Sequence, residues 1–146
     1  MFVREILKRK GHDIVVVAPG EALEFAAAKM KLEGVGALVV CEEGGKLLGV
    51  ISERGIVGAV VDYGPGALQR PTSDFMDANP ETCSPDDTIA SVAKKMTAAR
   101  VRHTPVCEAG GIAGVISIGD IVKERLEEME LERNMLRDMA AMHSVA

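Results

Sequence analysis

The stretch Gly49-Val50-Ile51-Ser52 recurs 65 residues further along the chain as Gly114-Val115-Ile116-Ser117. Other identities align with nearly the same shift, namely Pro19 with Pro85, Ala27 with Ala93, Lys29-Met30 with Lys95-Met96, Val35 with Val101, Val40-Cys41-Glu42 with Val106-Cys107-Glu108, Gly44-Gly45 with Gly110-Gly111, and Ile56-Val57 with Ile121-Val122. Together they make 16 identities over about forty positions with a single gap. Agreement of this extent indicates a tandem duplication.

Each copy has the pattern β-α-β-β-α. In the first copy, β-branched residues 14–17 predict a short strand, and helical spacing of apolar residues predicts a helix over 21–33. Residues 37–41 and 46–51 flank a Gly-Gly turn and predict a hairpin, and Ser52 begins a helix that runs to residue 61. The second copy repeats this order, with strands at 81–84, 103–107 and 112–116 and helices at 86–99 and from 118 onward.

The duplication also predicts the domain organisation. Residues 1–62 form the first repeat, 63–77 a linker that also begins the second repeat, 78–126 the rest of that repeat, and 127–146 a C-terminal helical tail. Residues 71–76 begin the second unit as residues 2–7 begin the first. One such unit leaves a sheet face uncovered, whereas two units can cover each other around a pseudo-twofold axis. The expected fold class is α+β, with two tandem repeats and a helical extension.

This arrangement resembles a known family. The tandem unit, the paired Gly-Val-Ile-Ser runs, and Arg102-His103-Thr104-Pro105-Val106 before the second hairpin are similar to a pair of cystathionine-β-synthase (CBS) domains, over residues 1–126. The resemblance implies a disc-like pair that forms a homodimer and binds an adenosine nucleotide such as AMP, ADP or ATP between the repeats. It also implies a regulatory role toward a protein partner that the sequence does not identify, and no catalysis.

Ser117 and Asp120 have two interpretations. An acid three residues after a serine at a helix start is a capping box, which satisfies free amides of the first turn. The same helix start can also attract an anion, and a nearby carboxylate can accept both hydroxyls of a ribose. The resemblance implies the second role, with Asp120 on the ribose and Ser117 near ribose or phosphate. In the first repeat Gly55 replaces the acid, so we expect one competent site in each chain.

The segment from Arg102 to Pro105 contributes the remaining site candidates. Arg102 can grip a phosphate through two hydrogen bonds, and His103 adds a donor or a pH-sensitive charge. The alternative is that both side chains only cap the strand end at the surface. The resemblance places Thr82, Thr104 and Pro105 with them around the base of the nucleotide.

Composition excludes several classes of partner. The chain has 146 residues, 17 Lys and Arg against 22 Asp and Glu, and 3% aromatic residues. An acidic, aromatic-poor chain is a poor match for nucleic acid, which needs basic faces and stacking platforms. No apolar run is long enough for a membrane span, and the charged start does not fit a secretory signal. Three cysteines without paired spacing predict free thiols in the cytoplasm, and no spacing typical of a metal site or a catalytic motif occurs.

The tail predicts a long helix. Residues 121–142 contain neither Gly nor Pro, so the helix that starts after Ser117 is expected to continue into the tail, with a break after Leu126 as the alternative. The helix carries two apolar stripes, one of Val122, Leu126, Met129, Leu136 and Ala140, the other of Leu131, Met135, Met139 and Met142. Either the helix is solvated or its stripes contact a dimer mate or partner. The second possibility supports an alternative function, a ligand-free interaction protein that presents this helix.

Overall fold

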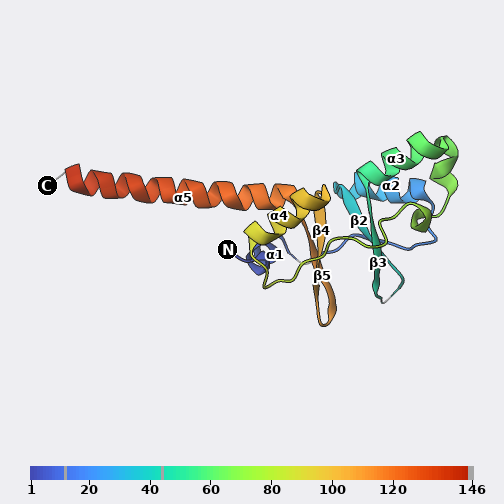
Figure 1. Cartoon of the computed structure of the whole chain (residues 1–146), viewed down its shortest axis with the longest axis horizontal. Helices are drawn as coiled ribbons and strands as arrows, with labels where there is room; N and C mark the ends of the chain where they lie inside the picture. Colours follow the sequence, from blue (N-terminus) through green and yellow to red (C-terminus); the bar gives the residue numbers. More distant parts are fainter. Residues whose placement is uncertain (12, 44, 145–146) are drawn as a thin grey trace.

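Two small sheets, one from each repeat, stand side by side at the centre of the molecule (Figure 1). The structure is a computed structural model, and it describes residues 1–11, 13–43 and 45–144. In the first sheet β1 (Val16–Val17) runs parallel to β2 (Ala37–Cys41), and β2 pairs antiparallel with β3 (Leu47–Ser52). The second sheet is the antiparallel pair β4 (His103–Glu108) and β5 (Gly111–Ser117).

The helices complete the predicted β-α-β-β-α order. The first repeat contributes α2 (Leu23–Glu33) and α3 (Glu53–Tyr63), and the second contributes α4 (Ile89–Ala99) and α5 (Ile118–Ser144). Helix α1 (Val3–Lys10) precedes them, and two 3-10 helices, η1 (Pro65–Gln69) and η2 (Thr72–Asp74), join the repeats. Helix α4 starts later than residue 86 because Thr88 caps it, its hydroxyl accepting a hydrogen bond from the Ser91 amide at 3.1 Å.

The strand expected at residues 81–84 is reduced to a single parallel bridge between Cys83 and Val106. In the first repeat the Val39 amide donates to the Val15 carbonyl at 3.1 Å and extends the ladder by one bond. The equivalent residues of the second repeat are Pro105 and Glu81, 66 positions later. Proline has no amide hydrogen, so this bond cannot form and the ladder ends at Cys83.

The segment that precedes each repeat packs on the core of the other one. Val3, Ile6 and Leu7 of α1 are buried with residues of α4, β4 and β5 in the core of the second repeat. Ala67 of η1 is buried with residues of α2, β2 and β3 in the core of the first repeat, and Phe75 packs against it. Residues 2–7 therefore lie against the second repeat in space although they come first in the chain.

A glycine marks the crossing point in each repeat. A Cβ atom on Gly114 would lie 2.7 Å from Cδ2 of Leu7, and one on Gly49 would lie 2.5 Å from the carbonyl oxygen of Asp77. These two glycines begin the duplicated Gly-Val-Ile-Ser runs. The first residue of that motif is thus explained by the close approach of the crossing segment.

Helix α5 is continuous, as predicted, and has no break after Leu126. Its 27 residues span about 40 Å at 1.5 Å per residue, and the C-terminal part projects away from the two sheets (Figure 1). No helix in the described ranges combines the length and the apolarity needed to cross a membrane.

Candidate functional site

Two neighbouring clefts lie between the repeats, with volumes of about 230 Å³ (cleft A) and about 300 Å³ (cleft B). Cleft A is lined by Gly36, Val50, Ser52, Glu53, Arg54, Asp77, Pro80, Glu81, Arg100, Val101, Arg102 and His103. Cleft B is lined by Lys10, Asp13, Val15, Gly34, Val35, Gly36, Ala37, His103, Val115, Ser117 and Asp120. Gly36 and His103 belong to both, so the two clefts adjoin each other at these residues.

Each cleft combines the helix start of one repeat with the strand start of the other. Cleft A joins Ser52, at the start of α3, to residues 100–103 before and at the start of β4. Cleft B joins Ser117 and Asp120, at the start of α5, to residues 34–37 before and at the start of β2. The duplication relates the two clefts, since Ser52 corresponds to Ser117 and residues 100–103 correspond to 34–37.

This exchange divides the predicted site residues between the clefts. Asp120 and Ser117 line cleft B, Arg102 lines cleft A, and His103 lines both. Thr82 lines neither cleft and is exposed, whereas Pro105 and Thr104 are buried in β4. The Thr104 hydroxyl has no hydrogen-bond partner among the described residues.

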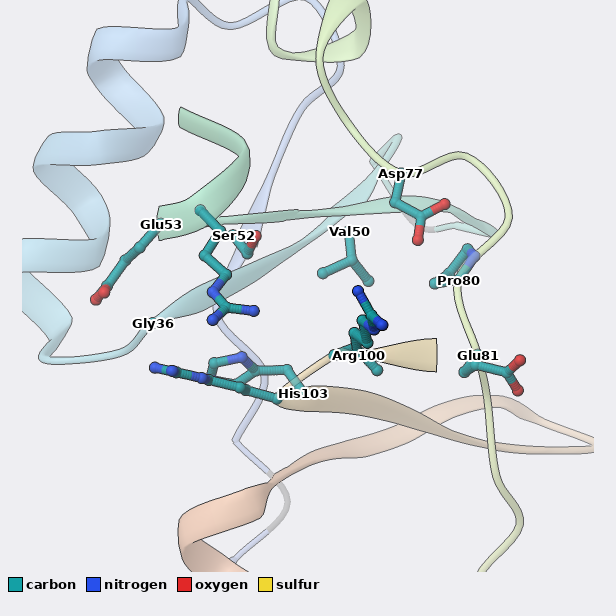
Figure 2. A pocket seen from close by; sticks show the side chains of 12 residues that line it. Gly36, Val50, Ser52, Glu53, Asp77, Pro80, Glu81, Arg100 and His103 are labelled. Carbon is teal, nitrogen blue, oxygen red and sulfur yellow. The ribbon is translucent and has the colours of Figure 1, made fainter. Parts of the chain in front are cut away.

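Cleft A carries three guanidinium groups, from Arg54, Arg100 and Arg102. None of them forms an ion pair with another described residue. Figure 2 shows Arg100 and His103 on one side of this cleft, with Val50 and Ser52 on the other. Guanidinium groups without a carboxylate partner are suited to phosphate, which they can bind through paired hydrogen bonds.

Arg100 holds an unusual backbone conformation at the mouth of cleft A. It ends α4 in the left-handed region, with φ 56° and ψ 40°, and it is the only non-glycine residue with positive φ in the described ranges. The equivalent residue in the first repeat is Gly34, with φ 68° and ψ 34°. A left-handed non-glycine residue costs roughly 1–3 kcal/mol and often marks a functional position. The exchange of Gly34 for Arg100 between the repeats was thus a sequence signal for this cleft that did not enter the prediction.

His103 sits between the clefts among charges of both signs. Burial and the neighbouring Lys10 ammonium lower the pKa of His103, and Glu53 and Asp120 only partly oppose this shift. The ring lies so close to Gly36 that a Cβ atom there would be 3.0 Å from its Cε1. The imidazole is therefore held as a mostly neutral group at the border that cleft A and cleft B share.

Asp120 forms a complete capping box at the start of α5. Its Oδ2 accepts the Ser117 amide at 2.8 Å, while the Ser117 hydroxyl accepts the Asp120 amide at 3.1 Å. Lys10 Nζ donates to the same Oδ2 at 2.7 Å. Burial alone would raise the pKa of Asp120, but the Lys10 ammonium and the Ser117 amide outweigh burial and lower it. Asp120 is thus a fixed carboxylate, with its side chain 24% exposed toward cleft B.

The first repeat keeps only half of this cap. The Ser52 hydroxyl accepts the Gly55 amide at 3.1 Å, but Gly55 has no carboxylate to return the bond. A Cβ atom on Gly55 would lie 3.2 Å from Cδ1 of the buried Ile51, so even a small side chain there needs the neighbour to shift. Cleft A accordingly lacks a carboxylate at the position equivalent to Asp120, although Glu53, Asp77 and Glu81 line it beside the arginines.

The two clefts together offer complementary groups for an anionic, hydroxyl-bearing ligand. A carboxylate and a helix N-terminus face cleft B, and arginines face cleft A. Lys10 and Arg100 add to these groups, and neither residue was predicted from the sequence. No cluster of three or more His, Cys, Asp or Glu side chains that could hold a metal ion occurs within residues 1–11, 13–43 and 45–144.

Comparison with known proteins agrees with the fold. A family model described as the CBS domain matches residues 3–62 and 73–127. The chain is 32% identical to a mitochondrial CBS domain-containing protein of Arabidopsis thaliana, over 90% of this chain and 68% of that protein. A CBS-domain containing protein from Agrobacterium tumefaciens has a similar structure, with a TM-score of 0.83 and 41% identity over 86% of this chain and 99% of that one. A CBS domain protein from Pyrobaculum aerophilum, solved in complex with AMP, aligns with a TM-score of 0.76 and 26% identity over 91% of this chain and 99% of that one. The chain therefore belongs to the CBS domain family, as a tandem pair of repeats.

Proposed function

We propose that this protein is a regulatory module that binds one adenosine nucleotide (AMP, ADP or ATP) in each chain. The ribose lies at Asp120 in cleft B, and the phosphates point past His103 toward the arginines of cleft A. The proposal is carried by the position of the Asp120 carboxylate at the start of α5 in cleft B. This cleft adjoins cleft A at Gly36 and His103, and cleft A contains three guanidinium groups without an ion-pair partner among the described residues.

The ribose contact uses the free side of Asp120. Its capping and ion-pair bonds all go to Oδ2, and Oδ1 forms no hydrogen bond to a described residue. A carboxylate oxygen without a partner can accept a ribose hydroxyl while the capping box stays formed. Binding both hydroxyls requires Lys10 to leave Oδ2, and its ammonium is then free to contact phosphate.

The phosphate contact uses Arg54, Arg100 and Arg102. A nucleotide with more phosphates reaches more of these groups, and each charge-assisted hydrogen bond contributes roughly 1.5–3 kcal/mol. The AMP complex of the Pyrobaculum protein supports an adenosine ligand in a pair of this kind. Adenosine without phosphate is expected to bind most weakly.

The regulatory role includes further proposals. The protein acts on a partner protein rather than on a substrate, and it works as a homodimer. Its cytoplasmic location stays a prediction. It is based on the three cysteines, Cys41, Cys83 and Cys107, which are all free thiols.

Titration calorimetry with adenosine, AMP, ADP and ATP tests the proposal. We expect one nucleotide per chain, lost in Asp120→Ala and retained in Gly55→Ala. Asp138→Ala is the matched control, because Asp138 is an exposed carboxylate near the far end of the same helix. Thermal unfolding of each variant separates lost binding from lost folding, since a ligand at 100 times its Kd adds about 2.7 kcal/mol of stability. Two equal sites per chain, or an unchanged affinity in Asp120→Ala, would contradict the proposal.

A second candidate is a ligand-free interaction protein, and two observations favour it. Lys10 already occupies Oδ2 of Asp120, and α5 exposes large apolar side chains such as Leu136 and Met142. Failure of all four compounds to bind or to raise the melting temperature would support this candidate instead.

A further inference from the structure

Most of α5 has no contact with the rest of the chain that would cover its apolar residues. Its buried residues are Ile121 and Glu124, both in the first two turns. Further along, Leu126, Met129 and Leu136 are 60%, 61% and 65% exposed. Figure 1 shows this part of the helix extending freely away from both sheets. A projecting helix with this much exposed apolar surface typically marks an interaction site.

One stripe of the helix has the spacing of a coiled-coil seam. Val122, Leu126, Met129, Arg133, Leu136, Ala140 and His143 follow one another in alternating steps of four and three residues. Five of these seven are apolar, and Met129, Leu136 and Ala140 line a shallow groove along the helix together with Arg133. Three heptads of this kind are the minimum pattern for a two-stranded coiled coil. We name this stripe the seam.

The charges that flank the seam identify the occupant. In a parallel, in-register coiled coil, the residue just before Leu126 or just before Arg133 in one helix faces the residue that lies five places further along in the second helix. Arg125 then faces Glu130 of the second copy, and Glu132 faces Arg137 of the second copy. Both contacts join opposite charges, and symmetry doubles them to four. The seam is therefore complementary to itself.

The other apolar stripe lacks this property. Leu131, Met135 and Met142 lie on the opposite face of the helix, and in the same geometry their flanking residues would place Glu127 against Glu132 of the second copy. Like charges in these positions oppose pairing. The charge pattern thus selects the seam over the second stripe.

We propose that α5 pairs with α5 of a second copy of this chain, as a parallel two-stranded coiled coil along the seam. Arg133 and His143 are the two polar residues in inner positions, and a polar residue in an inner position favours the in-register pair at some loss of stability. Arg133 is the one of the two in the middle of the seam. Its long side chain can keep the guanidinium in water while its methylene groups cover the seam. The pairing does not require nucleotide, so its failure leaves the proposed ligand site standing.

Disulfide crosslinking tests the orientation directly. In the parallel pair Leu136 faces Leu136 of the second copy, so the variant Leu136→Cys forms a covalent dimer on mild oxidation. Asn134→Cys is the matched control, because Asn134 is an exposed residue that points away from the seam. The parent chain, oxidised alongside, gives the background from its own three cysteines. Absence of the Leu136→Cys crosslink, or equal crosslinking at both positions, overturns the proposal. A crosslink that appears only when Leu126→Cys chains are mixed with Leu136→Cys chains indicates an antiparallel pair and overturns it too.

Charge reversal tests the complementarity. In the Leu136→Cys background, Arg137→Glu places like charges opposite each other twice and should slow crosslinking about tenfold. Adding Glu132→Arg to the same chain restores the opposite charges and most of the rate. Asp138→Lys, a reversal at the neighbouring outward position, should change the rate less than about twofold. Equal effects of Arg137→Glu and Asp138→Lys would show that the flanking charges do not guide the pairing.

Discussion

Lys10 and Asp120 form an ion pair that joins the end of α1 to the start of α5, with Nζ 2.7 Å from Oδ2. Arg9 reinforces this connection, since its Nη1 lies 2.7 Å from Oε1 of Glu124 and contacts Glu127 on the next turn. Helix α1 is therefore attached to the start of α5 directly beside cleft B. Any ligand that takes both oxygens of Asp120 must displace Lys10, which links occupancy of the cleft to the position of α1.

Replacing Lys10 by Met should strengthen the binding of adenosine. An exposed ion pair contributes about 0.2–1 kcal/mol, so freeing Asp120 should raise the affinity by up to about fivefold. Calorimetry with adenosine, which has no phosphate for Lys10 to contact, measures the effect. Lys8→Met, an exposed lysine on the same helix, should leave the affinity unchanged. A weaker affinity in Lys10→Met would mean that Lys10 holds the nucleoside rather than competing with it.

Nucleotide binding should take up a proton at His103. Burial and Lys10 lower the pKa of this histidine, so it is mainly neutral in the free protein near pH 7. A phosphate beside it favours the charged form and raises the pKa, so the affinity for AMP should rise as the pH falls toward the histidine pKa. Calorimetry in buffers of different ionisation enthalpy counts the protons taken up. The His103→Gln variant corrects for the titration of the phosphate itself, and the same proton uptake in this variant would exclude His103.

Arg100→Gly should stabilise the fold and weaken nucleotide binding. Glycine relieves the left-handed conformation at φ 56°, which should add about 1 kcal/mol to the free energy of unfolding. The loss of the guanidinium should lower the affinity for ATP by roughly tenfold or more. Arg100→Ala separates the two effects, because alanine loses the charge but keeps the strain. Urea unfolding and calorimetry on both variants provide the measurements. Equal stability of Arg100→Gly and Arg100→Ala would contradict the claim that the left-handed backbone at this position is strained.

Gly49→Ala should destabilise the protein more than Gly114→Ala. The new methyl group at position 49 meets the Asp77 carbonyl oxygen at 2.5 Å, and this oxygen is fixed because it accepts the Val50 amide at 3.0 Å. At position 114 the methyl group meets the end of the Leu7 side chain, which can rotate away. We expect the free energy of unfolding to fall by about 3 kcal/mol in Gly49→Ala and by about 1 kcal/mol in Gly114→Ala.

The control for this pair is Gly58→Ala. Gly58 lies within α3, and a Cβ atom there has nothing within 4 Å. Alanine should therefore stabilise the helix, by about 0.5–1 kcal/mol. Urea unfolding of the three variants gives the order, and a larger loss at Gly114 than at Gly49 would contradict the packing argument.

The sequence by itself determined the features that depend on local pattern. The duplication, the β-α-β-β-α order and the uninterrupted helix after Ser117 follow from periodicity, turn residues and the lack of Gly and Pro in residues 121–142. The capping box at Ser117 and Asp120 was also predictable, because its two partners are three residues apart.

The tertiary structure alone decided how the repeats share their parts. The Val39 amide extends the first ladder, and Pro105 at the equivalent position has no amide hydrogen. The resulting loss of the strand at residues 81–84 could be recognised only once the pairing of the strands was known. Arg102 and Asp120 were expected in one site, and they line different clefts. The physical reason is the pseudo-twofold packing. The core of each repeat is completed by the segment that precedes the other repeat, and in both clefts between the repeats the helix start of one meets the strand start of the other. No local pattern in the chain records that exchange.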